Sequence, residues 1–126
     1  MNKVIVAIGS NYDSRPRIEA AKKSLQRLIH NAGFTPEKET APIGVSLPCA
    51  NYTNLLAYGY TDISIDSLRE HLKDIEKACG DKREERRKGK VAMDLDILLY
   101  GSIRHHDADW QRDYIKEMIH SIHHFL

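Results

Sequence analysis

The chain has 126 residues, of which 41% are hydrophobic and 29% are charged, a balance that favours one globular domain over residues 1–126 and argues against a disordered protein. Nineteen Lys and Arg residues stand against 18 Asp and Glu residues, a formal net charge of +1. The overall charge therefore indicates neither a nucleic acid nor a membrane surface as a partner.

Two further features bear on the compartment. The apolar run in "MNKVIVAIGSN" is too short for a signal-peptide core, and no apolar segment approaches the roughly 20 residues of a membrane span. The two cysteines, Cys49 and Cys79, do not have the spacing of a metal site. We therefore expect a protein of the reducing cytoplasm, while its oligomeric state stays open.

The first half of the chain predicts a strand, a helix and two more strands. Residues 3–8, "KVIVAI", form an apolar run that is typical of a buried strand. Apolar residues at helical spacing then predict a helix that Ser14 caps and that the chain leaves at Gly33. Looser, strand-like patterns follow in residues 34–44 and 51–61.

The second half predicts a helix, a strand and a final helix. Ser64 or Asp62 caps the first of these helices, and a charged loop of residues 81–90, "DKREERRKGK", follows it. The strand occupies residues 91–101, and near-helical spacing predicts one more helix over residues 110–125. This order predicts an α+β, ferredoxin-like fold, with a βαββαβ core, an antiparallel sheet with helices on one face, and a C-terminal helix.

The last strand, "VAMDLDILLYG", carries two aspartates inside an apolar run. Because side chains alternate along a strand, Asp94 and Asp96 would share one face about 7 Å apart, while Leu99 and the other odd-numbered positions face the core. Like charges on one face repel, so the pair needs compensation. Carboxylates beside a cationic loop are typical of a polyphosphate site with Mg²⁺, although a solvated sheet face and a solvated loop are the plain alternatives. The cations of this loop are Lys82, Arg83, Arg86, Arg87, Lys88 and Lys90.

Three stretches, "AIGSN", "IEKACGDKR" and "MDLDILLYG", resemble the 6-hydroxymethyl-7,8-dihydropterin pyrophosphokinase family over about residues 3–101. Such enzymes have a ferredoxin-like core and transfer the terminal diphosphate of ATP to the hydroxymethyl group of a reduced pterin in folate biosynthesis, releasing AMP. The resemblance implies that the catalytic residues Asp94 and Asp96 hold two Mg²⁺ ions. It places Glu76 near the adenosine and makes Arg83 a catalytic, phosphate-binding cation of the loop.

The resemblance also implies further binding residues. Arg86 and Arg87 would assist Arg83 at the ATP phosphates. After Gly101 the family's spacing fits His106 and Arg112 as phosphate ligands, although an amphipathic helix with Arg112 in solvent is the alternative. The residues implied for the pterin are Thr40 and Ile43 in "TAPIG", Tyr52, Asn54, and Tyr114, which would stack on the ring.

The sequence departs from the family pattern at three places, where Asp81 replaces a loop arginine, Lys88 replaces a tryptophan and Lys90-Val91 replaces proline-arginine. These changes leave open a nucleotide- or pterin-binding relative with a regulatory role. An RNA-binding module shares the expected topology, but the stacking aromatic residues are missing from the last strand. His120 and His124 suggest zinc, for which no third ligand is evident.

Overall fold

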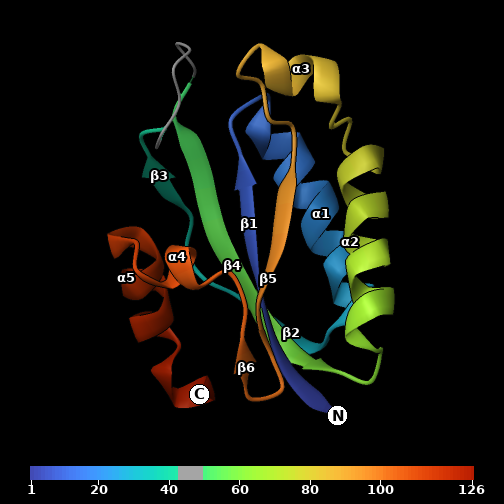
Figure 1. The fold of residues 1–126 in the computed structure, drawn as a ribbon, viewed down its shortest axis with the longest axis vertical. Helices are drawn as coiled ribbons and strands as arrows, with labels where there is room; N and C mark the ends of the chain where they lie inside the picture. The colour runs from blue at the N-terminus through green and yellow to red at the C-terminus, as the bar shows by residue number, and fades with distance from the viewer. Residues whose placement is uncertain (43–49) are drawn as a thin grey trace.

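The computed structural model describes residues 1–42 and 50–126, and it arranges them as one antiparallel sheet between two layers of helices (Figure 1). The strands are β1 (Asn2–Ser10), β2 (His30–Phe34), β3 (Lys38–Thr40), β4 (Tyr52–Thr61), β5 (Asp94–Tyr100) and β6 (Ile103–Arg104). The helices are α1 (Ser14–Leu28), α2 (Ile65–Ala78), α3 (Arg83–Arg87), α4 (Asp107–Trp110), α5 (Asp113–Ser121) and the 3-10 turn η1 (His123–Phe125). The predicted ferredoxin-like α+β fold is therefore confirmed, whereas Ile43 lies outside the described residues.

The strands lie in the order β2-β4-β1-β5-β6, and β3 pairs with β4 beyond the end of β2. β1 is central because it is apolar on both faces: Val4 and Val6 contribute to one hydrophobic core, and Ile5 contributes to the other. Its neighbours β4 and β5 both run antiparallel to it. The centre of the sheet thus places β4 and β5 on the two sides of one strand.

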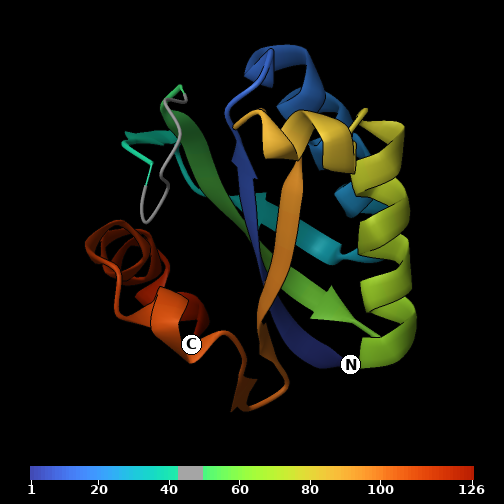
Figure 2. The same cartoon turned by 45° about the horizontal axis from the view of Figure 1, so that its top comes forward.

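Helices α1 and α2 cover one face of the sheet, as both views of the ribbon show (Figures 1 and 2). Their apolar stripes meet Met93, directly before β5, and Leu95 and Ile97 on one side of β5. Ser64 caps α2 as predicted, because its hydroxyl accepts a hydrogen bond from the Ser67 N–H at 3.2 Å. The buried residues of the two helices are Ile18, Ala21, Leu25, Leu68, Leu72 and Ile75.

The C-terminal segment covers the opposite face, where it packs on Ile5, Leu56 and Leu98 (Figure 2). The single helix predicted for residues 110–125 is wrong in its continuity, because the chain breaks into α4, α5 and η1. The break lets Trp110 turn inward, where its indole N–H donates to the carbonyls of Leu98 and His105. The second helical layer is therefore built around one buried tryptophan.

Three local predictions are corrected. Helix α1 ends at Leu28, and Gly33 lies in β2, where a Cβ atom would come within 2.5 Å of the Tyr58 ring. That glycine therefore serves close packing and not a helix end. Ser14 starts α1 but does not cap it, since its hydroxyl donates to the Ser10 carbonyl. Leu99 packs with Leu98 in the second core, because a β-bulge interrupts the alternation of β5.

Within residues 1–42 and 50–126 no helix combines the length and the apolar character that crossing a membrane requires. Cys79 is a free, buried thiol at the end of α2. Burial is the main cause that raises the pKa of this thiol, which favours its protonated form at neutral pH.

Candidate active site at the paired aspartates

Two rows of side chains cross the sheet from β4 to β5 and place the aspartates on one face. In the first row Gly9 of β1 pairs with Asn54 on one side and with Asp94 on the other. In the second row Ala7 lies between Leu56 and Asp96 in the same way. Residues directly opposite each other in neighbouring strands face the same side of a sheet. Both aspartates therefore face the side covered by α5. Between them and β4 lie only the hydrogen atom of Gly9 and the methyl group of Ala7.

This arrangement leaves a cavity of about 260 Å³ above Gly9 and Ala7. Its walls come from β4, β5, the end of β3 and helix α5. The cavity brings together residues predicted for two different roles, the metal site and the pterin pocket. The predicted residues that line it are Thr40, Tyr52, Asn54, Asp94, Asp96, Arg112 and Tyr114.

Asn54 is oriented by its neighbours. Its Nδ2 donates to Thr40 Oγ1 at 2.7 Å and to the Lys38 carbonyl at 3.4 Å. Its Oδ1 consequently lies over Gly9, 3.4 Å from the position that a Cβ atom there would take. Because Gly9 has no side chain, this oxygen is presented to the cavity as a hydrogen-bond acceptor.

The aspartate pair is electrostatically strained. Burial, followed by the charge of Asp94 and a hydrogen bond with it, raises the pKa of Asp96 to about 7. The pair would be relieved by a cation between or beside the two carboxylates. Hard carboxylate oxygens of this kind are the ligands that Mg²⁺ prefers, so the donor set fits the metal implied by the resemblance.

Among the described residues no group of three or more His, Cys, Asp or Glu side chains is arranged to hold a metal ion. That finding applies to the C-terminal histidines as well, so the zinc alternative gains no support in this part of the chain. Asp94 and Asp96 are two carboxylates, fewer than such a group requires, and Mg²⁺ usually takes one or two carboxylates and completes its shell with water and substrate phosphates.

A second cavity, of about 330 Å³, lies on the other side of the pair and shares Asp94 and Asp96 with the first. It follows the part of β5 that β6 does not reach, since β6 pairs only with Leu99 and Tyr100. There Glu76 of α2 takes the place of a neighbouring strand and accepts a hydrogen bond from the Leu95 N–H at 2.8 Å. Burial is the main cause that raises the pKa of Glu76.

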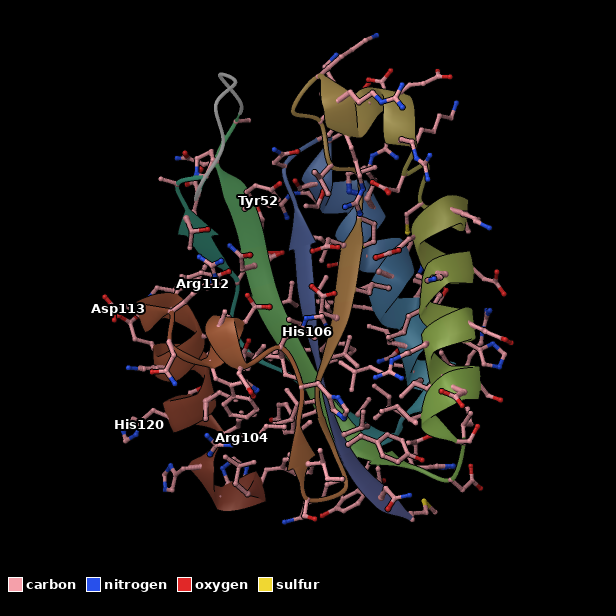
Figure 3. All side chains as sticks on the ribbon, in the orientation of Figure 1. Tyr52, Arg104, His106, Arg112, Asp113 and His120 are labelled. Atoms are coloured by element: carbon pink, nitrogen blue, oxygen red, sulfur yellow. The ribbon has the colours of Figure 1, made fainter. Side chains whose placement is uncertain are left out.

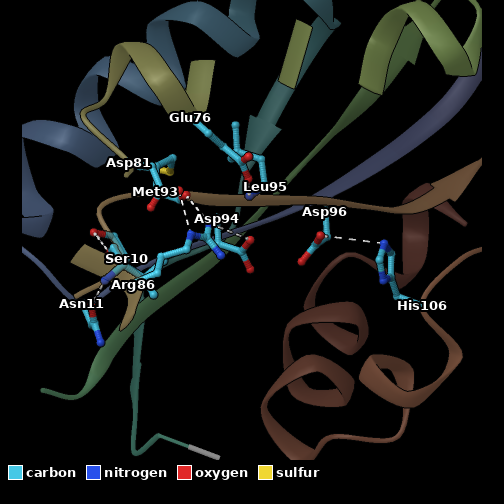
Figure 4. A network of polar contacts seen from close by, with 11 residues as sticks. Ser10, Asn11, Glu76, Asp81, Arg86, Met93, Asp94, Leu95, Asp96 and His106 are labelled. Carbon is cyan, nitrogen blue, oxygen red and sulfur yellow. Dashed lines mark hydrogen bonds and ion pairs between the residues drawn. The ribbon is translucent and has the colours of Figure 1, made fainter. Parts of the chain in front are cut away.

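The cationic segment 81–90 contains the short helix α3, which follows α2 along the chain (Figure 1). Asp81 and Arg86 of this segment line the second cavity. Arg86 points inward, where it donates to Asp81 and lies close to Asp94 (Figure 4). Arg83 and Arg87 are exposed, and neither forms an ion pair within the described parts of the chain. The three predicted loop arginines are thus divided between one bound to acids and two that face solvent.

The C-terminal segment contributes the remaining predicted residues (Figure 3). His106 lies before α4 with its Nε2 at 3.8 Å from Asp96 Oδ1. Arg112 stands at the start of α5, where its Nε donates to Asp109 Oδ1 at 3.2 Å. Asp109 also lines the first cavity and was not predicted from the sequence. Its signal is the spacing of three residues to Arg112, which on a helical turn permits an ion pair.

Asn11 is a second residue whose role was not predicted from the sequence. Its hydrogen bonds form a clasp between β1 and residues 89–91. Its Oδ1 accepts from the Val91 N–H at 2.6 Å, its own N–H donates to the Val91 carbonyl at 3.0 Å, and its Nδ2 donates to the Gly89 carbonyl at 2.9 Å. The side chain is buried. It therefore fastens the end of the cationic segment to β1, directly before the aspartates.

We expect Asn11→Ala to lower the free energy of unfolding by about 1–3 kcal/mol, because it leaves the Val91 N–H and the Gly89 carbonyl without their partners. Urea unfolding followed by circular dichroism measures the loss. Asn51→Ala, which shortens an exposed asparagine, serves as the control and should change stability by less than about 0.5 kcal/mol. Equal stability of the two variants would contradict the role of the clasp.

Comparison with known proteins finds one matching family and two similar proteins. A family model described as 7,8-dihydro-6-hydroxymethylpterin-pyrophosphokinase matches residues 5–124. Two proteins of Arabidopsis thaliana are similar as well. One, the folate synthesis bifunctional protein, is 30% identical over 126 residues, which cover 90% of this chain and 25% of the relative. The other, the mitochondrial folate synthesis bifunctional protein, is 29% identical over 127 residues, which cover 90% and 22%. The chain spans about a quarter of the length of these relatives.

Proposed function

This chain belongs to the 7,8-dihydro-6-hydroxymethylpterin-pyrophosphokinase family, and from that membership we propose that it transfers diphosphate from ATP to 6-hydroxymethyl-7,8-dihydropterin in folate biosynthesis. One observation carries the proposal for this particular chain. Asp94 and Asp96 stand at the junction of two cavities, so that two substrates could meet at the same pair of carboxylates.

The first cavity suits the pterin. Asn54 Oδ1 offers an acceptor to the ring's N–H groups, and the half-buried Tyr114 offers an aromatic surface on which a flat ring can stack. A volume of about 260 Å³ is close to the lower end for small-molecule sites. The hydroxymethyl group would then lie toward the aspartates.

The second cavity suits the nucleotide. Glu76, Arg86 and His106 line it. The exposed cations Arg83 and Arg87 belong to the same short helix α3 as Arg86, and we propose that they turn toward phosphate oxygens. Arg112 lines the first cavity, where its guanidinium is bonded to Asp109. These cations would hold the triphosphate in line with the pterin hydroxyl, which is the main contribution that protein side chains make to phosphoryl transfer.

We propose that Asp94 and Asp96 bind two Mg²⁺ ions, which when bound draw negative charge from the phosphates. In the reaction the pterin hydroxyl oxygen forms a bond to the β-phosphorus. The bond from that phosphorus to the oxygen bridging the α- and β-phosphates breaks, AMP leaves with this oxygen, and the hydroxyl proton is lost to solvent. The residues around the cavities orient the two substrates and exclude water from the β-phosphorus.

The proposal is tested by AMP formation from ATP, Mg²⁺ and 6-hydroxymethyl-7,8-dihydropterin, with the diphosphorylated pterin measured in parallel by mass spectrometry. Equal amounts of AMP and pterin diphosphate are expected. ADP in place of AMP, or no turnover by pure protein, would refute the transfer of diphosphate. If calorimetry then showed ligand binding without turnover, the regulatory relative suggested by Asp81 and Lys88 would take its place.

Asn54→Ala is expected to weaken pterin binding about tenfold to a hundredfold and to leave ATP binding unchanged, because only the first cavity loses a hydrogen-bonding group. Calorimetric titration with each ligand alone gives the two affinities. Thr53→Ala is a matched control, since Thr53 is adjacent in β4 and faces the other side of the sheet. A loss of ATP affinity as large as that of pterin affinity would contradict the assignment of the cavities.

We propose the cytoplasm as the site of this activity. A reducing compartment is compatible with the buried thiol of Cys79. One of the two similar Arabidopsis proteins carries the word mitochondrial in its name. Fractionation of the source cells with an antibody against the chain distinguishes the two compartments.

A further inference from the structure

Arg86 differs from the other cations of segment 81–90 because its side chain is held by acids at the candidate active site (Figure 4). Its Nε donates to Asp81 Oδ2 at 2.7 Å. Its Nη2 donates to the Met93 carbonyl at 3.0 Å and lies 3.4 Å from Asp94 Oδ1. One guanidinium therefore connects the loop after α2 with the first residue of β5.

The two acids hold Arg86 in different environments. Only 12% of the Asp81 side chain is exposed, compared with 42% of the Asp94 side chain. The contact with Asp81 is also the shorter, so Asp81 anchors the guanidinium and Asp94 is its more accessible contact. The planar fork of an arginine permits this division, because separate nitrogen atoms serve the two carboxylates.

The contact with Asp94 has a consequence for cation binding. The carboxylate expected to hold a divalent ion is already next to a positive charge, which lies on one of its two oxygens. A divalent ion on the same carboxylate would be repelled by the guanidinium at a distance of a few ångström. The two cations would therefore compete for one carboxylate.

We propose that Arg86 is the resident counter-cation of Asp94 and that a divalent metal ion displaces it, which releases α3 from the start of β5. This inference rests on the proposed function, because it takes Asp94 and Asp96 as the metal site. After displacement Asp81 still holds the guanidinium beside the second cavity. Arg86 is thus a positioning residue that keeps α3 in place without metal and stands ready for a phosphate group once metal has bound.

The competition predicts that removal of the Arg86 charge strengthens metal binding. In titrations of Mn²⁺ without nucleotide, with free Mn²⁺ measured by electron paramagnetic resonance, Arg86→Gln should bind about threefold to tenfold more tightly than the unmodified chain. Arg87→Gln is the matched control, because it removes the same charge from the next, exposed position of α3. We expect its affinity to change by less than about twofold.

The release of α3 has a readout of its own. Hydrogen exchange measured by mass spectrometry should show faster exchange in residues 83–90 of the unmodified chain when Mg²⁺ is added without nucleotide. In Arg86→Gln the same segment should exchange fast before Mg²⁺ is added and should not change afterwards. The Arg87→Gln chain should respond to Mg²⁺ as the unmodified chain does.

The possible outcomes bear on the displacement of Arg86 as follows. Equal or weaker Mn²⁺ affinity of Arg86→Gln, or slower exchange of residues 83–90 with Mg²⁺, would overturn the displacement. Absence of Mn²⁺ binding in every variant would overturn both the displacement and the metal site of the proposed function. If the metal data agree with the displacement but AMP formation fails, the proposed function is wrong in its chemistry and the exchange of cations still stands.

Discussion

Replacement of Asp96 by Asn is expected to lower the rate of AMP formation about a thousandfold and, at the same time, to stabilise the protein above pH 7. The loss of activity follows from the position of Asp96 at the junction of the two cavities, where it is proposed to hold Mg²⁺ beside the phosphates. Removing one positioned charge from a phosphoryl-transfer site costs about 3 kcal/mol or more in the transition state, which corresponds to roughly two to three orders of magnitude in rate.

The gain in stability follows from the direction of the pKa shift. Burial and the neighbouring Asp94 raise the pKa of Asp96 to about 7 from its ordinary value of 3.8. Below about pH 4 the group is protonated in the folded and in the unfolded chain, so it does not affect stability. Between pH 4 and pH 7 the group is protonated in the folded chain and ionised in the unfolded chain, so the free energy of unfolding falls as the pH rises. Above pH 7 the destabilisation is complete. About a third of the side chain is exposed, so we expect only about 1–2 kcal/mol.

Urea unfolding at pH 4 and pH 8, without metal, separates this effect from others. Asp96→Asn should be more stable than the unmodified chain at pH 8, and the two should be nearly equal at pH 4. Asp74→Asn removes the same charge from the exposed side of α2 and should show no such pH dependence. Unchanged turnover, or a loss of stability at pH 8 that is absent at pH 4, would contradict the pairing of the two aspartates.

The parts of the fold that were predicted from the sequence depend on local periodicity. The alternation in "MDLDILL" predicted that the two aspartates share a face, because strand geometry alone decides that question. The bulge in β5 was not predictable in this way, since Leu98 and Leu99 are both apolar and their pattern is equally compatible with either face. The break between α4 and α5 was missed for a related reason. The hydrophobic spacing continues across it, and only the burial of Trp110 against the sheet shows why the helix stops.

In the candidate site, too, local sequence patterns predicted some residues, and others became apparent only from the fold. Asp94 and Asp96 are visible from a stretch of three residues, and the family resemblance supplied partners for them along the chain. Arg86 was predicted as one cation among several, and only the folded chain shows that it alone reaches Asp81 and Asp94. Asn11 clasps residues 78 and 80 positions further along the sequence. A single sequence contains no physical signal for a contact of that separation, because it depends on which strands become neighbours.

The stability of the second layer depends on Trp110, and Trp110→Ala is expected to lower the free energy of unfolding by about 3–5 kcal/mol. The indole is 7% exposed and packs in the core that joins α4 and α5 to the sheet. Its N–H donates to the carbonyls of Leu98 and His105 at 3.1 and 3.0 Å, and the guanidinium of Arg104 stacks on its ring with 4.2 Å between the guanidinium carbon and the ring centroid. Alanine would remove the packing, both hydrogen bonds and the stacked ring at once.

Two further variants apportion that loss and connect it to function. Trp110→Phe should cost only about 1–2 kcal/mol, because most of the packing remains and the Leu98 carbonyl still accepts from the His105 N–H. Arg104→Ala removes only the stacked cation and should cost about 0.5–1 kcal/mol. Unfolding by urea, followed by circular dichroism, orders the three variants. Because α5 carries Tyr114 on the wall of the first cavity, Trp110→Ala should also weaken pterin binding more than ATP binding. Full stability in Trp110→Ala would show that the C-terminal helices are held to the sheet by other contacts.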